Sequence, residues 1–254
     1  MCSSDLIDGY TKEAGVRSLE RQIASICRKA VRQLYNNGAI DESKAPVRVN
    51  DKTLTEMLGK VKFEIEPANK KSDIGIVRGL AWTSVGGDTL EIEVNSMPGK
   101  ADMILTGQMG DVMQESARIA LTYVRSIVSK KPYNVDVEFF ENNCIHLHIP
   151  EGAVPKDGPS AGVTMATAIL SAVAQIPVKA DIAMTGEINL RGKVLPIGGL
   201  KEKLLAAKSA GIKTVLVPIK NKSDVEEFDK EITDGIQIEY MTDMKQVLEN
   251  ALDI

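Results

Sequence analysis

One serine in this sequence lies in a glycine-framed segment whose spacing favours nucleophilic chemistry. Ser160 is the central residue of G-P-S-A-G at 158–162, between a strand-like segment at 144–149 and an apolar segment at 163–174. The apolar segment has the length and composition of a buried helix. A hydroxyl at a helix start lies near free backbone N–H groups and the positive end of the helix dipole, which would stabilise an oxyanion. The simpler alternative is that Ser160 only caps the helix, since serine is among the commonest N-cap residues.

The base that would activate Ser160 is not a histidine in the usual order. The pattern G-x-S-x-G is typical of α/β-hydrolases, in which the acid and then the histidine follow the serine. Here His146 and His148 both precede Ser160, and no histidine follows it. This order excludes the α/β-hydrolase triad.

A lysine after Ser160 offers a different base. The segment 200–210 predicts a helix that ends at Gly211, and Lys203 lies beside its apolar stripe, whereas Lys201 and Lys208 point elsewhere. An ordinary lysine is almost wholly protonated at pH 7, so a lysine base needs a pKa lowered by about three units, which burial can supply. The alternative is a structural lysine at the edge of a core helix, with its charged end reaching water.

Three ordered motifs carry a family resemblance: P-K-D-G-P-S-A-G at 155–162, T-G-E at 185–187 and L-P-I-G-G-L-K-E-K at 195–203. Together they resemble the proteolytic domain of Lon, the ATP-dependent Ser–Lys protease. The resemblance implies that Ser160 is the nucleophile, that Lys203 is the general base and that Thr185 orients the lysine. Asp157 either caps the helix or pairs with Lys203 in an inactive state, and the sequence does not decide between these roles.

The first sixty residues have a different character. An amphipathic helix is expected from Tyr10 to about Tyr35, and its sequence around Arg17 resembles the α-helical lid of the AAA+ ATPases in the Lon family. The resemblance implies that Arg17 senses nucleotide in the full-length protein. No G-x-x-x-x-G-K-[ST] motif is present, so the phosphate-binding half of an ATPase is missing. We therefore expect no cofactor in this fragment, with ATP and magnesium belonging to the missing half.

The pattern of elements predicts a mixed α/β (α+β) protease domain after a small, mainly α-helical subdomain. We expect a lid subdomain at 1–62, a linker at 63–73 and a proteolytic domain at 74–254. Strands are expected at 135–139, 144–149, 213–218 and 236–240, and a hairpin at 181–194 carries Thr185 on its first arm. Helices alternate with these strands.

Composition excludes several classes of function. The 254 residues carry a net charge of −4, which favours neither nucleic acid nor an anionic membrane as partner. The three cysteines form no C-x-x-C pair, and His146 and His148 are too few for a zinc site, so we expect neither a disulfide framework nor a metal. No signal peptide or membrane span is evident, which predicts a cytoplasmic protein.

The resemblance to Lon further implies an ATP-dependent serine endopeptidase that degrades unfolded or damaged proteins as a homohexameric ring. The alternative is a non-catalytic AAA+ lid or scaffold module. Trp82, the only tryptophan, is expected to be a packing residue rather than a substrate contact. The sequence leaves open the cleavage preference, whether the fragment assembles or is active alone, and whether the Ser–Lys pair is formed at rest. It also leaves open the roles of His146, His148 and Trp82.

Overall fold

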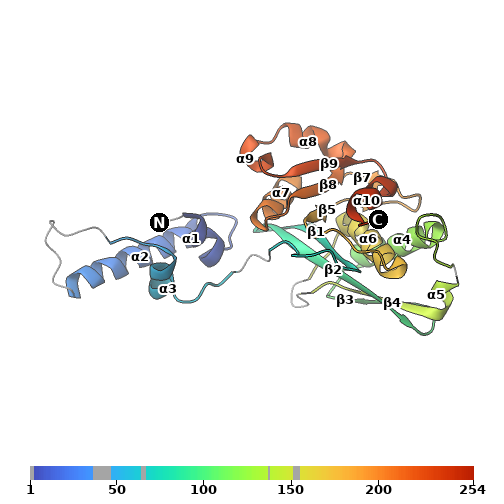
Figure 1. The fold of residues 1–254 in the computed structure, drawn as a ribbon. Coiled ribbons are helices and arrows are strands. Elements are labelled where there is room, and N and C mark those ends of the chain that lie inside the picture. Colours follow the sequence, from blue (N-terminus) through green and yellow to red (C-terminus); the bar gives the residue numbers. More distant parts are fainter. Residues whose placement is uncertain (1–2, 37–46, 64–66, 137, 151–154) are drawn as a thin grey trace. The chain divides into compact units, whose positions relative to one another are not determined.

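The computed structural model describes residues 3–36, 47–63, 67–136, 138–150 and 155–254 (Figure 1). The chain divides into two compact units. One comprises Met1–Glu66 with Ser84–Gly86, and the other comprises Pro67–Thr83 with Gly87–Ile254. The boundaries at 62 and 74 expected from the sequence stay a prediction.

The described helices of the first unit are α1 (Ser3–Tyr10), α2 (Arg17–Asn36) and α3 (Asp51–Leu58). They share a small core of Leu6, Tyr10, Ile26, Leu54 and Met57. The side chain of Asn50 caps α3 by accepting a hydrogen bond from the backbone N–H of Thr53.

The start of α2 differs from the sequence expectation of one helix from Tyr10. Tyr10 ends α1, which the sequence analysis missed, and α2 begins only at Arg17. The cause is a local cap, because the carboxylate of Glu13 accepts hydrogen bonds from the backbone N–H groups of Ser18 and Leu19. These N–H groups lie in the first turn of α2, where no preceding carbonyl is available.

The second unit is built on a seven-stranded sheet with the order β3-β4-β2-β1-β5-β8-β9 (Figure 1). Strand β4 is antiparallel to β2 and parallel to β3, and β1, β5, β8 and β9 run parallel. A separate antiparallel pair joins β6 and β7. The strands are β1 (Ile76–Thr83), β2 (Gly86–Pro98), β3 (Asp102–Thr106), β4 (Asn143–His148), β5 (Ile182–Met184), β6 (Glu187–Ile188), β7 (Val194–Leu195), β8 (Thr214–Pro218) and β9 (Gln237–Met241).

Helices cover both faces of this sheet. Alternate residues of β1 point to opposite faces, so Val77 belongs to the core that contains α6 and Leu80 to the core that contains α7. The helices are α4 (Asp111–Ile127), α5 (Phe139–Asn142), α6 (Gly162–Ala174), α7 (Leu200–Ser209), α8 (Lys222–Glu226), α9 (Lys230–Thr233) and α10 (Met244–Ala251), with short 3-10 helices η1 (Pro159–Ala161) and η2 (Ile219–Asn221). This mixed α/β architecture confirms the predicted fold class.

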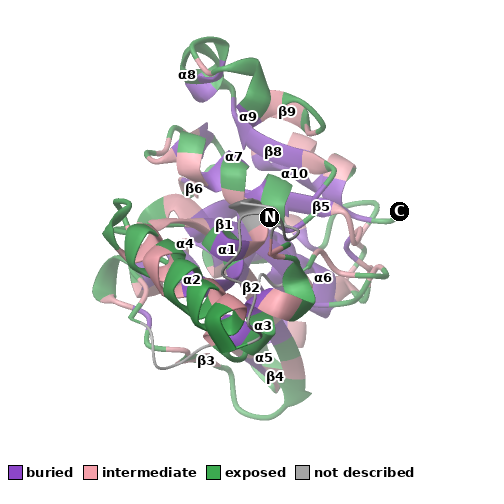
Figure 2. Cartoon of the chain, turned by 90° about the vertical axis from the view of Figure 1, so that its left-hand side faces the viewer, coloured by how far each residue is buried: buried purple, intermediate pink, exposed green. Residues whose placement is uncertain are grey.

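Helix α6 is buried around its whole circumference, as its apolar sequence predicts (Figure 2). Its polar side chains are satisfied locally; the hydroxyl of Thr167, for example, donates to the carbonyl of Val163 at 2.8 Å. A fully buried helix is a rigid support. The loop and 3-10 turn that precede α6 are therefore held at one end by the core.

Two local predictions in this unit were wrong. The described residues of 135–139 form no strand, because the carboxylate of Asp136 accepts from the N–H of Glu138 and its carbonyl from the N–H of Phe139, which starts α5. The predicted hairpin is the β6–β7 pair, and Thr185 lies before its first arm, in the turn between β5 and β6.

None of the described helices has the length and apolar composition needed to span a membrane.

Candidate active site

A cleft of about 680 Å³ on the second unit brings together the serine and the lysine singled out from the sequence. Its walls come from β1 and β2, from the segment that leads into η1, and from the start of α7. Ser160 and Lys203, which are far apart in the chain, line the same cleft.

Ser160 lies in the 3-10 turn η1, directly before α6. Gly158 has a φ of 122°, in the region that favours glycine. The ring of Pro159, the next residue, fixes its own φ and so restricts the turn. The carbonyl oxygen of Ser160 accepts hydrogen bonds from the N–H of Gly186 at 2.8 Å and from the hydroxyl of Thr185 at 3.3 Å. These bonds fix the backbone of Ser160, whose half-buried side chain lines the cleft.

The alternative role of Ser160 as an N-cap is wrong in this structure. Ala161 occupies the N-cap position of α6, and no side chain caps either η1 or α6. The Ser160 hydroxyl is thus not used to cap the helix.

Lys203 is 2 % exposed, although Lys201 and Lys208 on the same helix are exposed. It shares the buried side of α7 with Leu200, Leu204 and Ala207, as the apolar stripe predicts. Burial lowers the pKa of Lys203 from 10.5 to about 8. At pH 7 roughly a tenth of the amine is then neutral, against about one part in 3,000 for an unperturbed lysine.

Thr185 connects the lysine to the serine. Its side chain is 1 % exposed, and its backbone N–H donates to the carbonyl of Leu216 on β8 at 3.1 Å. The hydroxyl accepts a hydrogen bond from Nζ of Lys203 at 3.0 Å and donates one to the carbonyl oxygen of Ser160. A threonine hydroxyl has one donor and two acceptor positions, so it makes both bonds at once.

Asp157 holds the segment before Ser160 against α4. Its Oδ1 accepts hydrogen bonds from the N–H of Met113 at 2.9 Å and from the N–H of Gly158 at 2.8 Å. Met113 is in the first turn of α4, where the N-cap Gly110 offers no side chain. The aspartate therefore caps α4 rather than the helix after Ser160.

The two histidines share one face of β4, as their spacing predicts. Oγ1 of Thr106 lies 3.0 Å from Nε2 of His146 and 2.7 Å from Nδ1 of His148. Among the described residues, no group of three histidine, cysteine, aspartate or glutamate side chains could hold a metal ion. The pair thus binds a threonine hydroxyl on the surface of β3 and β4.

Trp82 lines the cleft, whereas the sequence favoured a packing role for it. Its side chain is 61 % exposed and lines the cleft, so it is not a core packing residue. One part of the ring lies against Gly199 at the start of α7, where an added Cβ would come within 2.8 Å of Cγ of the tryptophan. Only the approach of β1 to α7 in space reveals this position, since the two segments are far apart in sequence.

Arg17, singled out as a nucleotide sensor, is the exposed first residue of α2 in the other unit. The described residues around it include no phosphate-binding loop. The arginine alone does not make a nucleotide site, and its role as a sensor stays a prediction.

Comparison with known proteins identifies relatives of both units. The family model of the Lon protease (S16) C-terminal proteolytic domain matches residues 48–254, and that of the Lon protease AAA+ ATPase lid domain matches residues 3–46. The chain is 51 % identical to the Lon protease of Lachnoclostridium phytofermentans, with 97 % of this chain and 34 % of that protein covered. It is 49 % identical to Lon protease 1 of Bacillus subtilis, with 98 % and 31 % covered. The chain thus spans about a third of the length of these relatives.

Proposed function

The chain belongs to the Lon protease family, and we propose that its second unit is a serine peptidase in which Ser160 is the nucleophile and Lys203 the general base. The supporting observation is the state of Lys203, a buried amine with a pKa of about 8 that lines the same cleft as Ser160. The other two lysines of α7, Lys201 and Lys208, are exposed, so burial is specific to Lys203 within this helix.

The proposed reaction begins with the transfer of the Ser160 hydroxyl proton to the neutral amine of Lys203. The alkoxide attacks a peptide carbonyl, and the negative charge that forms on the carbonyl oxygen is stabilised by N–H groups at the start of α6. Protonated Lys203 then gives its proton to the leaving amine, and an acyl-enzyme remains on Ser160. Water releases the acyl group by the same route, with Lys203 again accepting and returning the proton.

Thr185 is a positioning residue in this scheme. In the structure, the amine of Lys203 donates to Thr185 rather than to Ser160. The threonine hydroxyl therefore holds the amine close to the serine backbone, and proton transfer requires a side-chain rotation that brings the amine of Lys203 to the hydroxyl of Ser160. Hydrogen bonds in catalytic sites are often looser before substrate binds.

The activity of the whole protein extends this proposal. The relatives are about three times as long as this chain, and we propose that the additional length in the full protein includes an ATPase half that feeds substrates into the cleft. We also propose that these substrates are unfolded or damaged proteins. The working form that we propose is a hexameric ring in the cytoplasm. ATP and magnesium would bind that half. The described residues of this chain include no phosphate-binding loop, and the proposed peptidase reaction itself uses only Ser160, Lys203 and water.

Hydrolysis of a short fluorogenic peptide and of an unfolded protein, with and without ATP, tests the proposal. We expect ATP-independent peptide hydrolysis that is lost in Ser160→Ala and kept in the control Ser209→Ala, which removes an exposed hydroxyl at the end of α7. Equal activity of Ser160→Ala and the unchanged chain would refute the nucleophile. No activity in any form, under conditions where the chain is folded, would favour the alternative of a non-catalytic lid or scaffold module.

A further inference from the structure

A second cavity, of about 660 Å³, lies on the second unit and shares no lining residue with the Ser160 cleft. It is formed by the end of α4, the segment 130–133 that follows it, Lys179, and the helix α10 with the residues after it. Cavities of about 300–1,000 Å³ are typical of small-molecule sites.

The inner surface of this cavity is aromatic and aliphatic. Ile127 of α4 and Leu248 and Leu252 at α10 contribute the aliphatic part, and Tyr123 and Tyr133 the rings. The ring of Tyr123 is fixed by Gly192, whose φ is 79°, because an added Cβ at this glycine would lie 2.2 Å from the ring. An ordered wall of this kind favours an apolar ligand body.

Tyr123 also offers an unused polar group. The residue is 8 % exposed, and within the described part of the chain its hydroxyl has no hydrogen-bond partner. The pKa of Tyr123 is raised to about 12, mainly by burial and to a smaller extent by Tyr133 and Asp243. The hydroxyl is therefore a neutral donor at physiological pH, able to donate a hydrogen bond to a ligand in the cavity.

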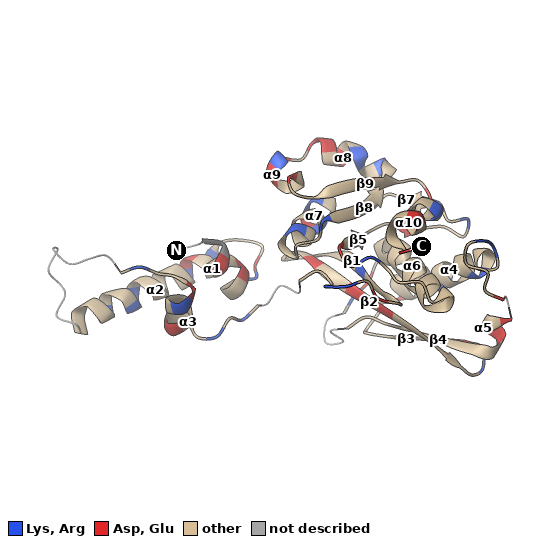
Figure 3. Cartoon of the chain, in the orientation of Figure 1, with Lys and Arg blue, Asp and Glu red and all other residues tan. Residues whose placement is uncertain are grey.

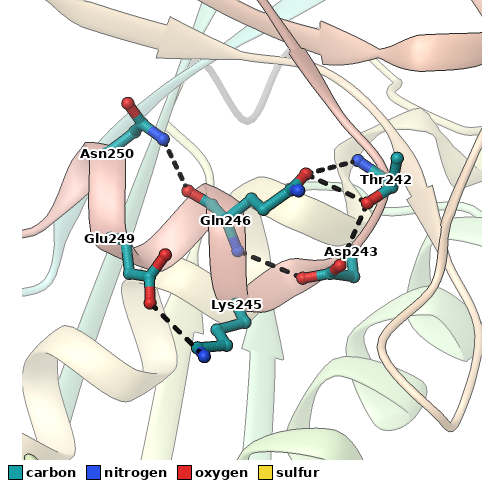
Figure 4. A network of polar contacts seen from close by, with 6 residues as sticks. All are labelled: Thr242, Asp243, Lys245, Gln246, Glu249 and Asn250. Carbon is teal, nitrogen blue, oxygen red and sulfur yellow. Dashed lines mark hydrogen bonds and ion pairs between the residues drawn. The ribbon is translucent and has the colours of Figure 1, made fainter.

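The rim of the cavity is cationic. Lys130, Lys131, Lys179 and Lys245 line it, against the carboxylates of Glu249 and Asp253. Figure 3 colours Lys and Arg blue and Asp and Glu red, and both colours lie on α10. On α10, Nζ of Lys245 lies 3.8 Å from Oε1 of Glu249 (Figure 4). Lys179 donates to the carbonyl of Asn250 at 2.8 Å.

Lys130 and Lys131 are different from these two lysines. Both are exposed, and neither has an ion-pair partner among the described residues. Two uncompensated ammonium groups at the mouth of an apolar cavity attract an anionic head group.

We propose that this cavity binds a small amphipathic anion, with an aliphatic or aromatic body between Tyr123, Tyr133 and Leu248 and a carboxylate or phosphate head near Lys130 and Lys131. The free molecule is the ligand, since a concave pocket lined by Tyr123 and Tyr133 accommodates a single body and not a flat membrane surface. The site is separate from the proposed peptidase chemistry and does not depend on it.

Calorimetric titration of the whole chain with decanoate, below its micelle concentration, tests the proposal. We expect saturable binding at one site, at least tenfold tighter than that of the neutral analogue decanol. Backbone amide shifts in NMR spectra should fall on residues 123–133 and 245–254. The double variant Lys130→Glu/Lys131→Glu should weaken decanoate binding at least tenfold, and Tyr123→Phe should weaken it severalfold. Lys220→Glu, an exposed lysine outside the cavity, is the matched control and should bind as the unchanged chain does.

Several results would overturn the proposal. These are unchanged decanoate binding in both cavity variants, equal affinity for decanol, amide shifts confined to the Ser160 cleft, or binding only to phosphatidylglycerol vesicles. The double variant alters only exposed side chains, so it should fold, and circular dichroism checks this independently of binding.

Discussion

The amine of Lys203 donates a hydrogen bond of 3.0 Å to Oγ1 of Thr185, and the same hydroxyl donates to the carbonyl oxygen of Ser160 at 3.3 Å. This chain of bonds joins α7, the turn after β5 and the turn before α6. It places a buried amine with a pKa of about 8 next to the backbone of the proposed nucleophile.

Replacing Thr185 by valine keeps the shape of the side chain and removes its hydroxyl. Lys203 then loses its acceptor, and the turn that holds Ser160 loses one of its two donors. We expect kcat for a fluorogenic peptide to fall about 10- to 100-fold with little change in KM. Thr185→Ser restores the hydroxyl and should recover most of the rate. Equal kcat for the valine variant and the unchanged chain would show that the threonine does not position the lysine.

Replacing Lys203 by methionine should raise stability while it abolishes hydrolysis. Between pH 8 and 10.5, the unfolded chain binds a proton at Lys203 that the folded chain has lost. Burial of the Lys203 amine therefore lowers the free energy of unfolding by about 3 kcal/mol at any pH below 8. This loss of stability disappears as the pH rises through 10.5.

Lys203→Met removes this loss of stability but also removes the hydrogen bond to Thr185, which partly offsets the gain. We therefore expect the free energy of unfolding to increase by about 1–3 kcal/mol at pH 7. The gain should shrink as the pH approaches 10.5, and urea denaturation at a series of pH values measures it. Lys201→Met, at an exposed position of the same helix, should change stability by less than about 0.5 kcal/mol. If Lys203→Met were less stable than the unchanged chain at pH 7, burial of the Lys203 amine would not destabilise the folded state.

Gly87 sets the distance between β2 and α7. A Cβ at this position would lie 2.0 Å from the carbonyl oxygen of Glu202 and 3.1 Å from Cβ of Ala206. Gly87→Ala must therefore displace the helix that carries Lys203, at a cost of about 1–3 kcal/mol. We expect a lower thermal midpoint together with reduced hydrolysis. Gly99→Ala is the control, because nothing lies within 4 Å of its added Cβ. Equal losses of stability and hydrolysis in both variants would show that the close approach of Gly87 to α7 does not matter.

Asp157 supports the serine turn by capping α4. Removing its carboxylate leaves the N–H groups of Met113 and Gly158 without this acceptor. We expect Asp157→Ala to cost about 1–2 kcal/mol in urea unfolding and to lower kcat, whereas Asp157→Asn keeps an oxygen acceptor and loses less. Equal losses for alanine and asparagine would argue against the cap.

The sequence predicted the parts of the cleft that depend on local chemistry. Proline and glycine before Ser160 mark the turn, and uninterrupted small and apolar residues mark α6 as a buried helix. The position of Lys203 beside the apolar stripe of α7 predicted its burial. In each case the signal is contained in a few neighbouring residues.

The features that were missed depend on contacts between distant segments or on competing local bonds. Trp82 becomes a cleft residue only because β1 approaches Gly199. Ser160 is not the N-cap of α6 because it lies within the 3-10 turn that precedes this helix. The side chain of Asp136 starts a helical turn where the alternation at 135–139 predicted a strand.

Covalent labelling of Ser160 at different pH values tests the Ser160–Lys203 pair most directly. A fluorophosphonate forms a phosphonyl ester with an activated serine and releases fluoride, and mass spectrometry locates the modified residue. If Lys203 is the base, the rate of labelling at Ser160 should rise with pH through about 8, because the amine becomes neutral there. Lys203→Gln should lose this labelling almost completely, and Lys201→Gln should keep it. Labelling of Ser160 at an equal rate in Lys203→Gln, or a rate with no dependence on pH near 8, would contradict the account.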